Sequence, residues 1–582
     1  MAEQIKKPQI NMNQKLELTW IGKGEEDVLE PRILIENTEY SYGDPHTDNI
    51  IIHGDNLLAL KSLVASGYAG KVKCIYIDPP YNTGSAFEHY DDNLEHSIWL
   101  SLMKQRLEQL YTLLAEDGVL FIQIDDSEMP YLAVLMDEIF GRGNRINTIC
   151  VNMSNASGVK ITAAIRGARF PKIKEYILLY AKNKEQYWLV IPKVQKEKWD
   201  PEYNLIIPSF TPSHLQAFTS GELTNEDVAN LTICSLKKYL KDNKIKETLE
   251  WKQNNAFRIF ASKPNSALLK IATGLVFNSN LAIVKNASGD KKLIKTDFNR
   301  KTKTARIELV SAEINDSIYL GDHWEDIVTT GGVAKEGSVS FPNGKKPEKL
   351  LHRIIQCATS PGDLVLDSFL GSGTTVAVAH KMGRRYIGIE LGNHAYTHCV
   401  PRLKMVIDGT DKGGVTSATS WTSGGGFRFY ELAPTLIKTD NEGMPIINPE
   451  YNAEMLAAAM AMHEGFCYAP DPDVFWKQGY STEHDFIYTT TQHLTIDTME
   501  YIDSLLGEDE TILICCASHS AGLVNRFPRI TVKRIPRMLL GRCVFDPEKN
   551  YNLNIITLPE VADQDDEDDE DDEDDEDDED DE

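Results

Sequence analysis

The sequence lacks the marks of a membrane protein and of a secreted protein. No apolar run approaches the roughly 18 residues that a membrane-spanning helix needs, and the N-terminal MAEQIKKPQINMNQ has no apolar core of a signal peptide. The nine cysteines include no Cys-x-x-Cys pair, so neither a zinc site nor a disulfide framework is indicated. We therefore expect a cytoplasmic protein with reduced cysteines, no metal site and no membrane partner.

Positive charge is also scarce. The chain of 582 residues has 60 Lys and Arg against 88 Asp and Glu, a formal net charge of -28. Asp563 and the unbroken acidic run 565–582 supply 19 of the negative charges, so about -9 remains for everything else. A segment of this composition buries nothing and repels itself, which predicts that residues 563–582 are a disordered tail. The negative average therefore does not exclude an anionic partner for the rest of the chain.

Two stretches of the chain alternate short apolar strands with amphipathic helices. In the first, strands are predicted in NIIIHGD, VKCIYI and DGVLFIQID, and helices in NLLALKSL, SIWLSLMKQRLEQLYTLL and YLAVLMDEIFG. In the second, residues 363–366 are a predicted strand, 376–381 a helix and 385–389 another strand. This alternation is typical of an α/β fold with a parallel sheet covered by helices. The chain is too long for one core, so further units are expected.

The segment between these stretches has a different composition. Residues 151–320 contain 27 Lys and Arg but 16 Asp and Glu, and periodicity is weak except in EYILLYAKN (175–183), which is predicted to be a strand. The excess of positive charge indicates a surface that faces phosphates, or a solvated insert whose lysines contact nothing. After residue 426, ETILICCASHSAGLVNRFPRITVKRIP predicts strand, helix and strand, without a recognisable catalytic motif.

A candidate catalytic motif lies in CIYIDPPYNTG, residues 74–84. The apolar residues run directly into Asp78, Pro79, Pro80 and Tyr81. Because proline lacks the donor that a sheet ladder needs, the strand is predicted to end here, with Asp78 and Tyr81 at its exit. Taken alone, the motif leaves open a simple turn in which Asp78 only caps backbone amides.

A second motif, DSFLGSGTT (367–375), joins a predicted strand to a predicted helix. Gly371 and Gly373 allow the backbone to approach a ligand closely, and Glu390 at the end of the next strand can hold ribose hydroxyls. The loop lacks the six-residue dinucleotide pattern and the Gly-Lys-Ser/Thr of a phosphate-binding loop. The motif therefore favours a nucleoside cofactor without a pyrophosphate.

Together, DPPY and FLGSG resemble the motifs of amino-methylating, S-adenosylmethionine-dependent DNA methyltransferases of the beta class, in which the catalytic motif precedes the cofactor motif. IDPPYNTG, DGVLFIQIDDSE, DEIFG, EYILLYAKN and FPNGKKPEKLL are similar to stretches of the modification (Mod) subunits of type III restriction-modification systems. The resemblance covers residues 15 to 430. It implies a Rossmann-like, circularly permuted methyltransferase fold with an inserted target-recognition domain and an additional C-terminal α/β region.

The resemblance also implies a division of the chain into six parts. These are an N-terminal extension (1–48), the catalytic half of the methyltransferase domain (49–185), a target-recognition insert (186–327), the cofactor-binding half (328–426), a C-terminal region without a readable role (427–562) and the acidic tail (563–582).

Roles for individual residues follow from the resemblance. Asp78 and the carbonyl of Pro79 are expected to accept the two hydrogens of an exocyclic amine, Pro80 to fix the turn and Tyr81 to stack on a flipped base. S-adenosyl-L-methionine is expected to be held by eight residues: Asp55, Asp367, Phe369, Gly371, Ser372, Gly373, Thr374 and Glu390. Lys346 and Pro347 are expected at its methionine end. Two alternatives stay open: Asp55 could simply cap a helix, and Lys346 could simply be a surface lysine.

The activity that the resemblance implies is transfer of methyl to adenine N6 in double-stranded DNA, as the modification subunit of a restriction-modification or related defence system. A homodimer and a partner restriction (helicase/nuclease) subunit are expected. Three alternatives stay open: an N4-cytosine DNA methyltransferase, a subunit that mainly recognises DNA for a nuclease, and a transferase for RNA or protein amide nitrogen. Asp125, Asp126 and Glu128 resemble a magnesium site, but we interpret them as acids near a helix N-terminus. The tail is expected to be solvated only, or to mimic DNA phosphates.

Overall fold

The computed structural model describes the chain from residue 17 to residue 539, with short gaps. The gaps are residues 25–28, 83–95, 155–166, 169, 196–197, 301, 303, 316, 328–332, 342–343, 524–525, 536 and 538. The chain forms two compact units, one of Met1–Val190 with Asp322–Glu582 and one of Ile191–Gly321. The predicted acidic tail lies outside the described residues. Among the described helices, none has the length and apolar composition that a membrane crossing requires.

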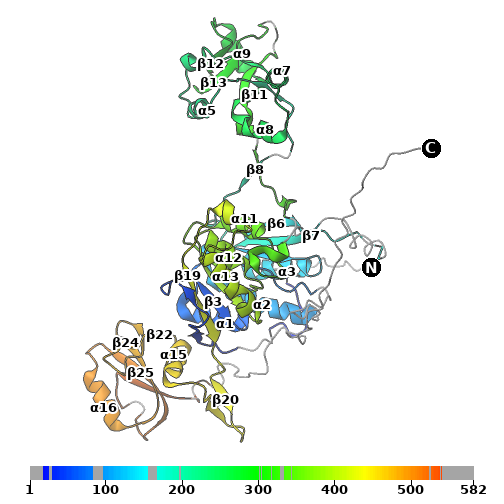
Figure 1. Cartoon of the computed structure of the whole chain (residues 1–582). Helices are drawn as coiled ribbons and strands as arrows, with labels where there is room; N and C mark the ends of the chain where they lie inside the picture. The colour runs from blue at the N-terminus through cyan, green and yellow to red at the C-terminus, as the bar shows by residue number, and fades with distance from the viewer. Residues whose placement is uncertain are drawn as a thin grey trace, which may run out of the picture. The chain divides into compact units, whose positions relative to one another are not determined.

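One large sheet organises the first unit (Figure 1). Its described strands follow the order β1-β19-β3-β18-β17-β4-β5-β7-β6-β16, and β2 pairs with β19. Six neighbouring strands, from β19 to β5 in this order, run parallel, and β7 is antiparallel to β5. The strands of this sheet are β1 (Leu34–Glu36), β2 (Tyr42–Gly43), β3 (Ile50–His53), β4 (Val72–Ile77), β5 (Leu114–Ile124), β6 (Arg145–Asn152), β7 (Lys174–Ala181), β16 (His323–Trp324), β17 (Leu364–Asp367), β18 (Arg385–Glu390) and β19 (Gly426–Leu432).

The central strands are apolar because helices cover the sheet on both sides. All six residues of β4 are buried, and Ile75 and Leu120 share a core with helix residues such as Leu107. The helical segments of this part are α1 (Asn56–Leu63), η1 (Val64–Tyr68), α2 (His96–Leu113), α3 (Met129–Met136), η2 (Asp137–Gly141), η3 (Arg142–Asn144), η5 (Val333–Ser338), α11 (Glu348–Ala358), α12 (Thr374–Lys381), η6 (Ala395–Cys399), α13 (Val400–Ile407) and α14 (Thr416–Thr419). The α/β alternation read from the sequence is confirmed.

Element boundaries differ from the sequence prediction by a few residues. Strand β5 begins at Leu114 rather than Asp117, and α12 begins at Thr374 rather than Val376. Strands β1 and β2 lie within the expected N-terminal extension, and β19 begins at Gly426, where the cofactor-binding half was expected to end, and adds a strand to the same sheet. Strands β1 and β2 have three and two residues and no buried residue, so they show no apolar pattern in the sequence.

The second unit, Ile191–Gly321, lies within the range 186–327 expected for the insert. It is more regular than its weak periodicity predicted. Its larger sheet is antiparallel, and among its strands β14 alternates buried with exposed or partly exposed residues, whereas β12 is buried at four consecutive positions. A six-stranded sheet follows the order β10-β9-β11-β14-β13-β12, and β8 pairs with β15. The elements are β8 (Lys193–Gln195), β9 (Tyr203–Ile206), α5 (Pro212–Thr219), α6 (Asn225–Val228), β10 (Cys234–Ser235), α7 (Leu236–Asp242), α8 (Leu249–Asn254), η4 (Ala256–Arg258), β11 (Ile259–Pro264), α9 (Ser266–Thr273), β12 (Leu281–Lys285), β13 (Lys291–Lys295), β14 (Arg306–Ser311), α10 (Ala312–Asn315) and β15 (Ser317–Tyr319).

The region after β19 contains a further sheet, of order β22-β23-β24-β25-β26, and the hairpin β20-β21. Its elements are β20 (Ile437–Thr439), β21 (Pro445–Ile447), α15 (Ala453–Glu464), β22 (Cys467–Tyr468), β23 (Gly479–Thr482), β24 (Asp485–Leu494), α16 (Ile496–Leu505), β25 (Thr511–His519) and β26 (Ile530–Arg534). The predicted helix between β25 and β26 is wrong, since the described residues there form turns. Gly522, at φ 79, and Pro528 explain why a helix does not continue.

Candidate active site

The two sequence motifs meet at one edge of the large sheet. Strand β4 ends at Ile77, directly before Asp78, and β17 ends at Asp367. The two strands are parallel neighbours, with Cys74 opposite Val365 and Ile75 opposite Leu366. The carboxyl ends of adjacent parallel strands border a crevice, which is where α/β sheets bind ligands. Segments nearly three hundred residues apart in the chain therefore contribute to one site.

Three polar side chains converge at the end of β4. Tyr81 donates its hydroxyl hydrogen to Asp78 Oδ1 at 2.6 Å. Lys346 Nζ lies 3.2 Å from Asp78 Oδ2, donates to the Tyr81 hydroxyl at 2.9 Å and lies 5.0 Å from the centroid of that ring. Trp99 Nε1 donates to the carbonyl of Pro80 at 2.8 Å and so holds the turn. Lys346 thus contacts the catalytic motif itself, which the sequence did not predict.

Glu175 completes this cluster from the start of β7. One of its carboxylate oxygens lies 3.2 Å from Lys346 Nζ and 2.8 Å from the Tyr81 hydroxyl, and accepts a hydrogen bond from Gln123. Gln123 is fully buried in β5 and accepts from Tyr76 at 2.7 Å. Sequence reasoning missed Glu175 and Gln123, although a polar residue inside the apolar run DGVLFIQID was an available sign of Gln123.

Burial and charge act in opposite directions on these carboxylates. Burial raises the pKa of Asp78 to about 6, and the Lys346 ammonium limits that rise. Burial also acts to raise the pKa of Glu175, but Lys346 and the hydrogen bonds from Gln123 and Tyr81 hold it below its usual value. Asp78 is therefore mostly ionised at neutral pH, as an acceptor for an amine must be.

The glycine-rich loop is held by the carboxylates at its two sides. Asp367 accepts hydrogen bonds from the amide of Phe369 at 2.9 Å and the hydroxyl of Thr375 at 2.5 Å. Glu390 accepts from the amide of Gly371 at 2.7 Å. Gly373 has φ 79, and a Cβ there would lie 3.3 Å from Cys399, so glycine is required on both counts.

Beside this loop the surface has a partly open cavity lined by eight residues: Asp55, Asn56, Arg106, Ser368, Phe369, Ile389, Glu390 and Leu391. Of the residues predicted to bind a cofactor, Asp55, Phe369 and Glu390 line it. The hydroxyl of Ser368 is buried and has no hydrogen-bond partner among the described residues. Carboxylates for ribose hydroxyls, an aromatic ring and apolar Ile389 and Leu391 suit a nucleoside, so the cavity fits the expected cofactor class.

Asp55 is a helix-capping aspartate, one of the two interpretations that the sequence left open, and it also lines the cavity. It caps α1 by accepting from the amide of Leu58 at 3.0 Å, and it pairs with Arg106 at 3.1 Å. Asn56 donates to the carbonyl of Ser368 at 2.8 Å and accepts from Arg106, which ties the cavity wall to the loop. Arg106 is buried on α2 and lines the cavity, whereas a basic residue on a helix is usually exposed.

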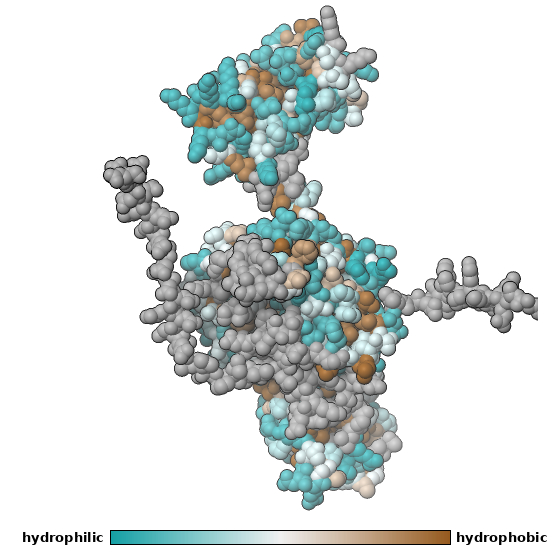
Figure 2. All heavy atoms as spheres, turned by 90° about the vertical axis from the view of Figure 1, so that its right-hand side faces the viewer, coloured by the Kyte–Doolittle hydropathy of each residue, from teal (hydrophilic) through white to brown (hydrophobic). Residues whose placement is uncertain are grey.

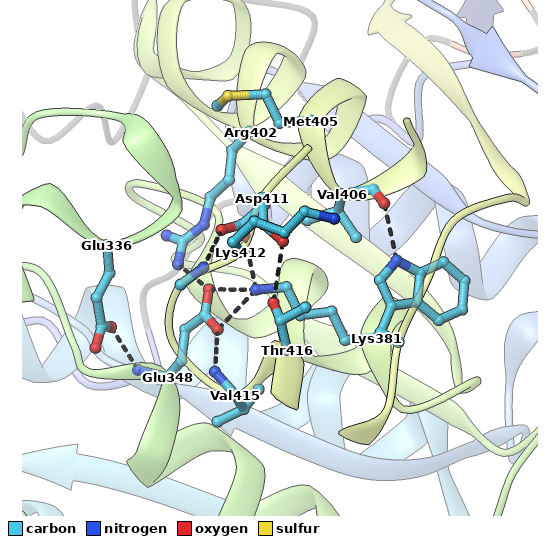
Figure 3. A network of polar contacts seen from close by, with 12 residues as sticks. Glu336, Glu348, Lys381, Arg402, Met405, Val406, Asp411, Lys412, Val415 and Thr416 are labelled. Atoms are coloured by element: carbon cyan, nitrogen blue, oxygen red, sulfur yellow. Dashed lines mark hydrogen bonds and ion pairs between the residues drawn. The ribbon is translucent and has the colours of Figure 1, made fainter. Parts of the chain in front are cut away.

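Ser372 and Thr374 are buried beside a cluster of charges that we call the buried cluster, formed by Glu348, Lys381, Arg402 and Asp411. Lys381 lies 2.9 Å from Glu348 and 2.7 Å from Asp411, and Arg402 lies 2.8 Å from Glu348 (Figure 3). Arg402 also donates to the Ser372 carbonyl at 3.2 Å and the Thr374 hydroxyl at 2.8 Å. Ser372 and Thr374 therefore connect the loop to the buried cluster, and neither residue lines the cavity.

The acidic residues after β5 are accounted for by local contacts. Asp125 accepts from the amide of Ser127 at 2.7 Å and pairs with Lys172, and Asp126 pairs with Lys174. Glu128, the residue before α3, is fully buried and accepts from Asn82 at 2.7 Å. Within the described part of the chain, no group of three or more His, Cys, Asp or Glu side chains is arranged to hold a metal ion.

Comparison with known proteins agrees with this geometry. A family described as DNA methylase matches residues 72–400. The probable type III restriction-modification enzyme HindVI Mod subunit of Haemophilus influenzae is 38% identical over 69% of this chain and 56% of the relative. The type III EcoPI Mod subunit of Escherichia phage P1 is 30% identical over 62% of this chain and 60% of the relative. The chain therefore spans a little over half the length of these two relatives.

Among solved structures, the M1.HpyAVI-SAM complex is similar at 16% identity and a TM-score of 0.30, over 61% of this chain and 98% of that one. That score is too low to carry an argument. The family match, by contrast, covers more than half of the 582 residues and includes both motifs at the ends of β4 and β17. This chain belongs to the DNA methylase family.

Proposed function

We propose that this protein transfers a methyl group from S-adenosyl-L-methionine to the N6 amine of adenine in double-stranded DNA, as the modification subunit of a restriction-modification system. The observation that carries the proposal is the meeting of the Asp-Pro-Pro-Tyr motif with the glycine-rich loop at neighbouring strand ends. Membership of the DNA methylase family and the names of the two Mod relatives support it.

The cavity beside the loop would hold the cofactor. Glu390 and Asp55 would accept hydrogen bonds from its hydroxyls, and Phe369 and Ile389 would pack against its base. The unpartnered hydroxyl of Ser368 is available to a polar group of the ligand. When bound, S-adenosylmethionine supplies an electrophilic methyl group and its own leaving group, so the protein's task is binding and alignment.

The residues at the end of β4 would prepare the amine. The adenine amine is a weak nucleophile because its lone pair is delocalised into the ring. Asp78 and the carbonyl of Pro79 would accept its two hydrogens, which directs the lone pair away from the ring. Tyr81 offers a ring face for the base, which must leave the duplex to reach the site. In this structure the two carboxylate oxygens of Asp78 are paired with the Tyr81 hydroxyl and the Lys346 ammonium. At least one of these two partners must therefore give way before Asp78 can accept a hydrogen bond from the amine.

The unit Ile191–Gly321 would read the DNA sequence. It contains 20 Lys and Arg against 14 Asp and Glu, so it is basic within an acidic chain. The face seen in the upper part of Figure 2 is mostly hydrophilic, and the guanidinium of Arg258 lies within 5.8 Å of the ring centroids of Tyr239 and Trp251. Cations beside aromatic rings suit contacts to phosphates and bases. A homodimer, a restriction subunit as partner and a cytoplasmic location remain parts of this proposal.

The test is incubation of the full chain with methyl-labelled S-adenosylmethionine and DNA of mixed sequence, followed by nucleoside analysis and sequencing of the modified sites. We expect labelled N6-methyladenine at one short sequence, absent from D78A. Labelled N4-methylcytosine would refute the assignment to adenine. Label in RNA or protein with none in DNA would refute the proposal, and binding without any transfer by the wild-type chain would favour a recognition subunit.

A further inference from the structure

Lys346 joins two carboxylates that come from distant parts of the chain. Its ammonium lies 3.2 Å from Asp78 Oδ2 and 3.2 Å from Glu175 Oε2, and it donates to the Tyr81 hydroxyl between them at 2.9 Å. The Lys346 side chain is 10% exposed and the two carboxylates are 19% exposed, so water screens these charges only in part. A single cation therefore compensates two neighbouring anions, and Asp367 at the end of β17 is a third carboxylate, whose pKa burial raises to about 7 and which Asp78 repels.

The backbone around Lys346 is fixed on both sides. Before it, the buried Lys345 donates to the carbonyls of Val339, at 2.8 Å, and Glu336. After it, the Glu348 carboxylate forms ion pairs with Lys381 and Arg402 in the buried cluster (Figure 3). The same Arg402 holds the glycine-rich loop, so one rigid assembly sets the positions of both the cofactor loop and the Lys346 ammonium.

The chemistry of methyl transfer makes this placement consequential. A carboxylate accepts hydrogen bonds at both oxygens, whereas a protonated carboxyl group uses one oxygen as a donor and holds an amine less well. Two carboxylates that share one site without a cation cannot both remain ionised, because burial and mutual repulsion favour protonation of one. Loss of Lys346 would therefore remove the condition under which Asp78 accepts an amine hydrogen near neutral pH.

We propose that Lys346 is a positioning residue for the transfer, which keeps Asp78 ionised and correctly aimed while Glu175 holds the ammonium between them. The inference rests on the proposed methyl transfer and adds to it a residue outside both sequence motifs. Lys346 moves no proton and contacts no reacting atom in this role. Its effect on the reaction passes through the charge and the orientation of Asp78.

The role predicts opposite effects for two substitutions. In K346M, Asp78 loses its cation while Glu175 remains, so Asp78 ionises at higher pH; in E175Q, Asp78 keeps the cation and loses a negative neighbour, so it ionises at lower pH. The acidic limb of kcat/KM against pH should move up by about 1 to 3 pH units in K346M and down in E175Q, because a nearby charge shifts a pKa by that amount. K346R keeps the positive charge, so the acidic limb of its kcat/KM profile should lie at the same pH as that of the wild type.

A matched control is available three residues further along. Lys349 is 58% exposed and pairs with Asp326 at 2.8 Å, so K349M removes the same kind of side chain and the same kind of ion pair. It lies away from Asp78 in the contacts that the structure describes, and its pH profile should coincide with that of the wild type. Coincident limbs for K346M, E175Q and the wild type would overturn the proposal, as would equal shifts in K346M and K349M.

A second measurement needs neither cofactor nor DNA. Carboxylates whose pKa is raised in the folded state stabilise the fold at low pH and lose that contribution as pH rises through the folded pKa. The melting temperature of ligand-free K346M should therefore fall more steeply between about pH 5.5 and pH 8 than that of the wild type. A parallel course would refute the charge role even if the wild type methylated no DNA, which separates failure of this inference from failure of the proposed function.

Discussion

The buried cluster gives the sharpest prediction for stability, through the substitution K381M. Lys381 Nζ is fully buried and lies 2.7 Å from Asp411 and 2.9 Å from Glu348. Methionine fills a similar volume without the charge. Glu348 keeps Arg402 and the amide of Val415 as partners, so the loss falls mainly on Asp411, which retains the amide of Gly413.

Removing one partner of a buried ion pair costs about 3 to 5 kcal/mol, because the other charge stays buried without compensation. Since Glu348 remains paired, we expect the lower end, about 3 kcal/mol. The unfolding entropy is about 2.1 cal/mol/K per residue, so a unit of about 400 residues loses about 1.2 °C per kcal/mol, and the melting temperature should fall by about 4 °C.

Thermal unfolding of the full chain, followed by differential scanning fluorimetry, measures this change. The matched control is K412M, since Lys412 is an exposed lysine of the same loop whose ammonium donates to the carbonyl of Gly409 at 2.6 Å and forms no ion pair among the described residues. K412M should melt within about 1 °C of the wild type, as surface substitutions usually do. A melting temperature of K381M equal to that of K412M would refute the assignment of stability to the buried cluster.

Three further predictions concern the site itself. D78N keeps the shape of the side chain but replaces one acceptor oxygen by a donor, and methylation rates should fall at least about 100-fold while calorimetry shows unchanged affinity for S-adenosylmethionine; wild-type rates would contradict the proposed role of Asp78. E390Q weakens the hydrogen bonds that Glu390 makes to the loop and offers to a ribose, so affinity for S-adenosylmethionine should fall about tenfold by the same calorimetry; unchanged affinity would place the cofactor elsewhere. G373A places a side chain at φ 79 and 3.3 Å from Cys399, so it should lower stability by about 1 to 2 kcal/mol in thermal unfolding; G143A, where a Cβ would meet nothing within 4 Å, should not, and equal effects would contradict this account of the loop.

Sequence reasoning identified candidate site residues at positions whose backbone geometry depends on neighbouring residues in the chain. Asp78 and Tyr81 follow a strand that ends at two prolines, and Gly371 and Gly373 stand where a strand turns into a helix. Each of these positions can be read from neighbours within ten residues. The α/β fold class was predicted correctly because apolar strands and amphipathic helices alternate along the chain, and the family was predicted correctly because DPPY and FLGSG resemble its motifs.

The parts that sequence reasoning missed depend on contacts between distant segments. Lys346 is 171 residues from Glu175, and nothing in either neighbourhood indicates that the two side chains meet. Arg106 is another example, because a basic residue on a helix is usually exposed, whereas here it is buried against Asp55 and Asn56. The edge strands β1 and β2 were missed because strands of three and two residues show no periodicity.

The short ladder of β8 and β15 has a consequence for how such chains diversify. Lys193 is opposite Tyr319 in this ladder, and the amide of Leu320 donates to the carbonyl of Pro192 at 2.9 Å. The unit Ile191–Gly321 therefore begins and ends beside the two-stranded ladder of β8 and β15, which we call the neck. A gene segment cut at that neck could be exchanged for another of different length without altering the ends that the host chain must join. On the role proposed for this unit, recombination between such segments would change the DNA sequence that is recognised, while the strands that carry Asp78 and the glycine-rich loop are inherited intact.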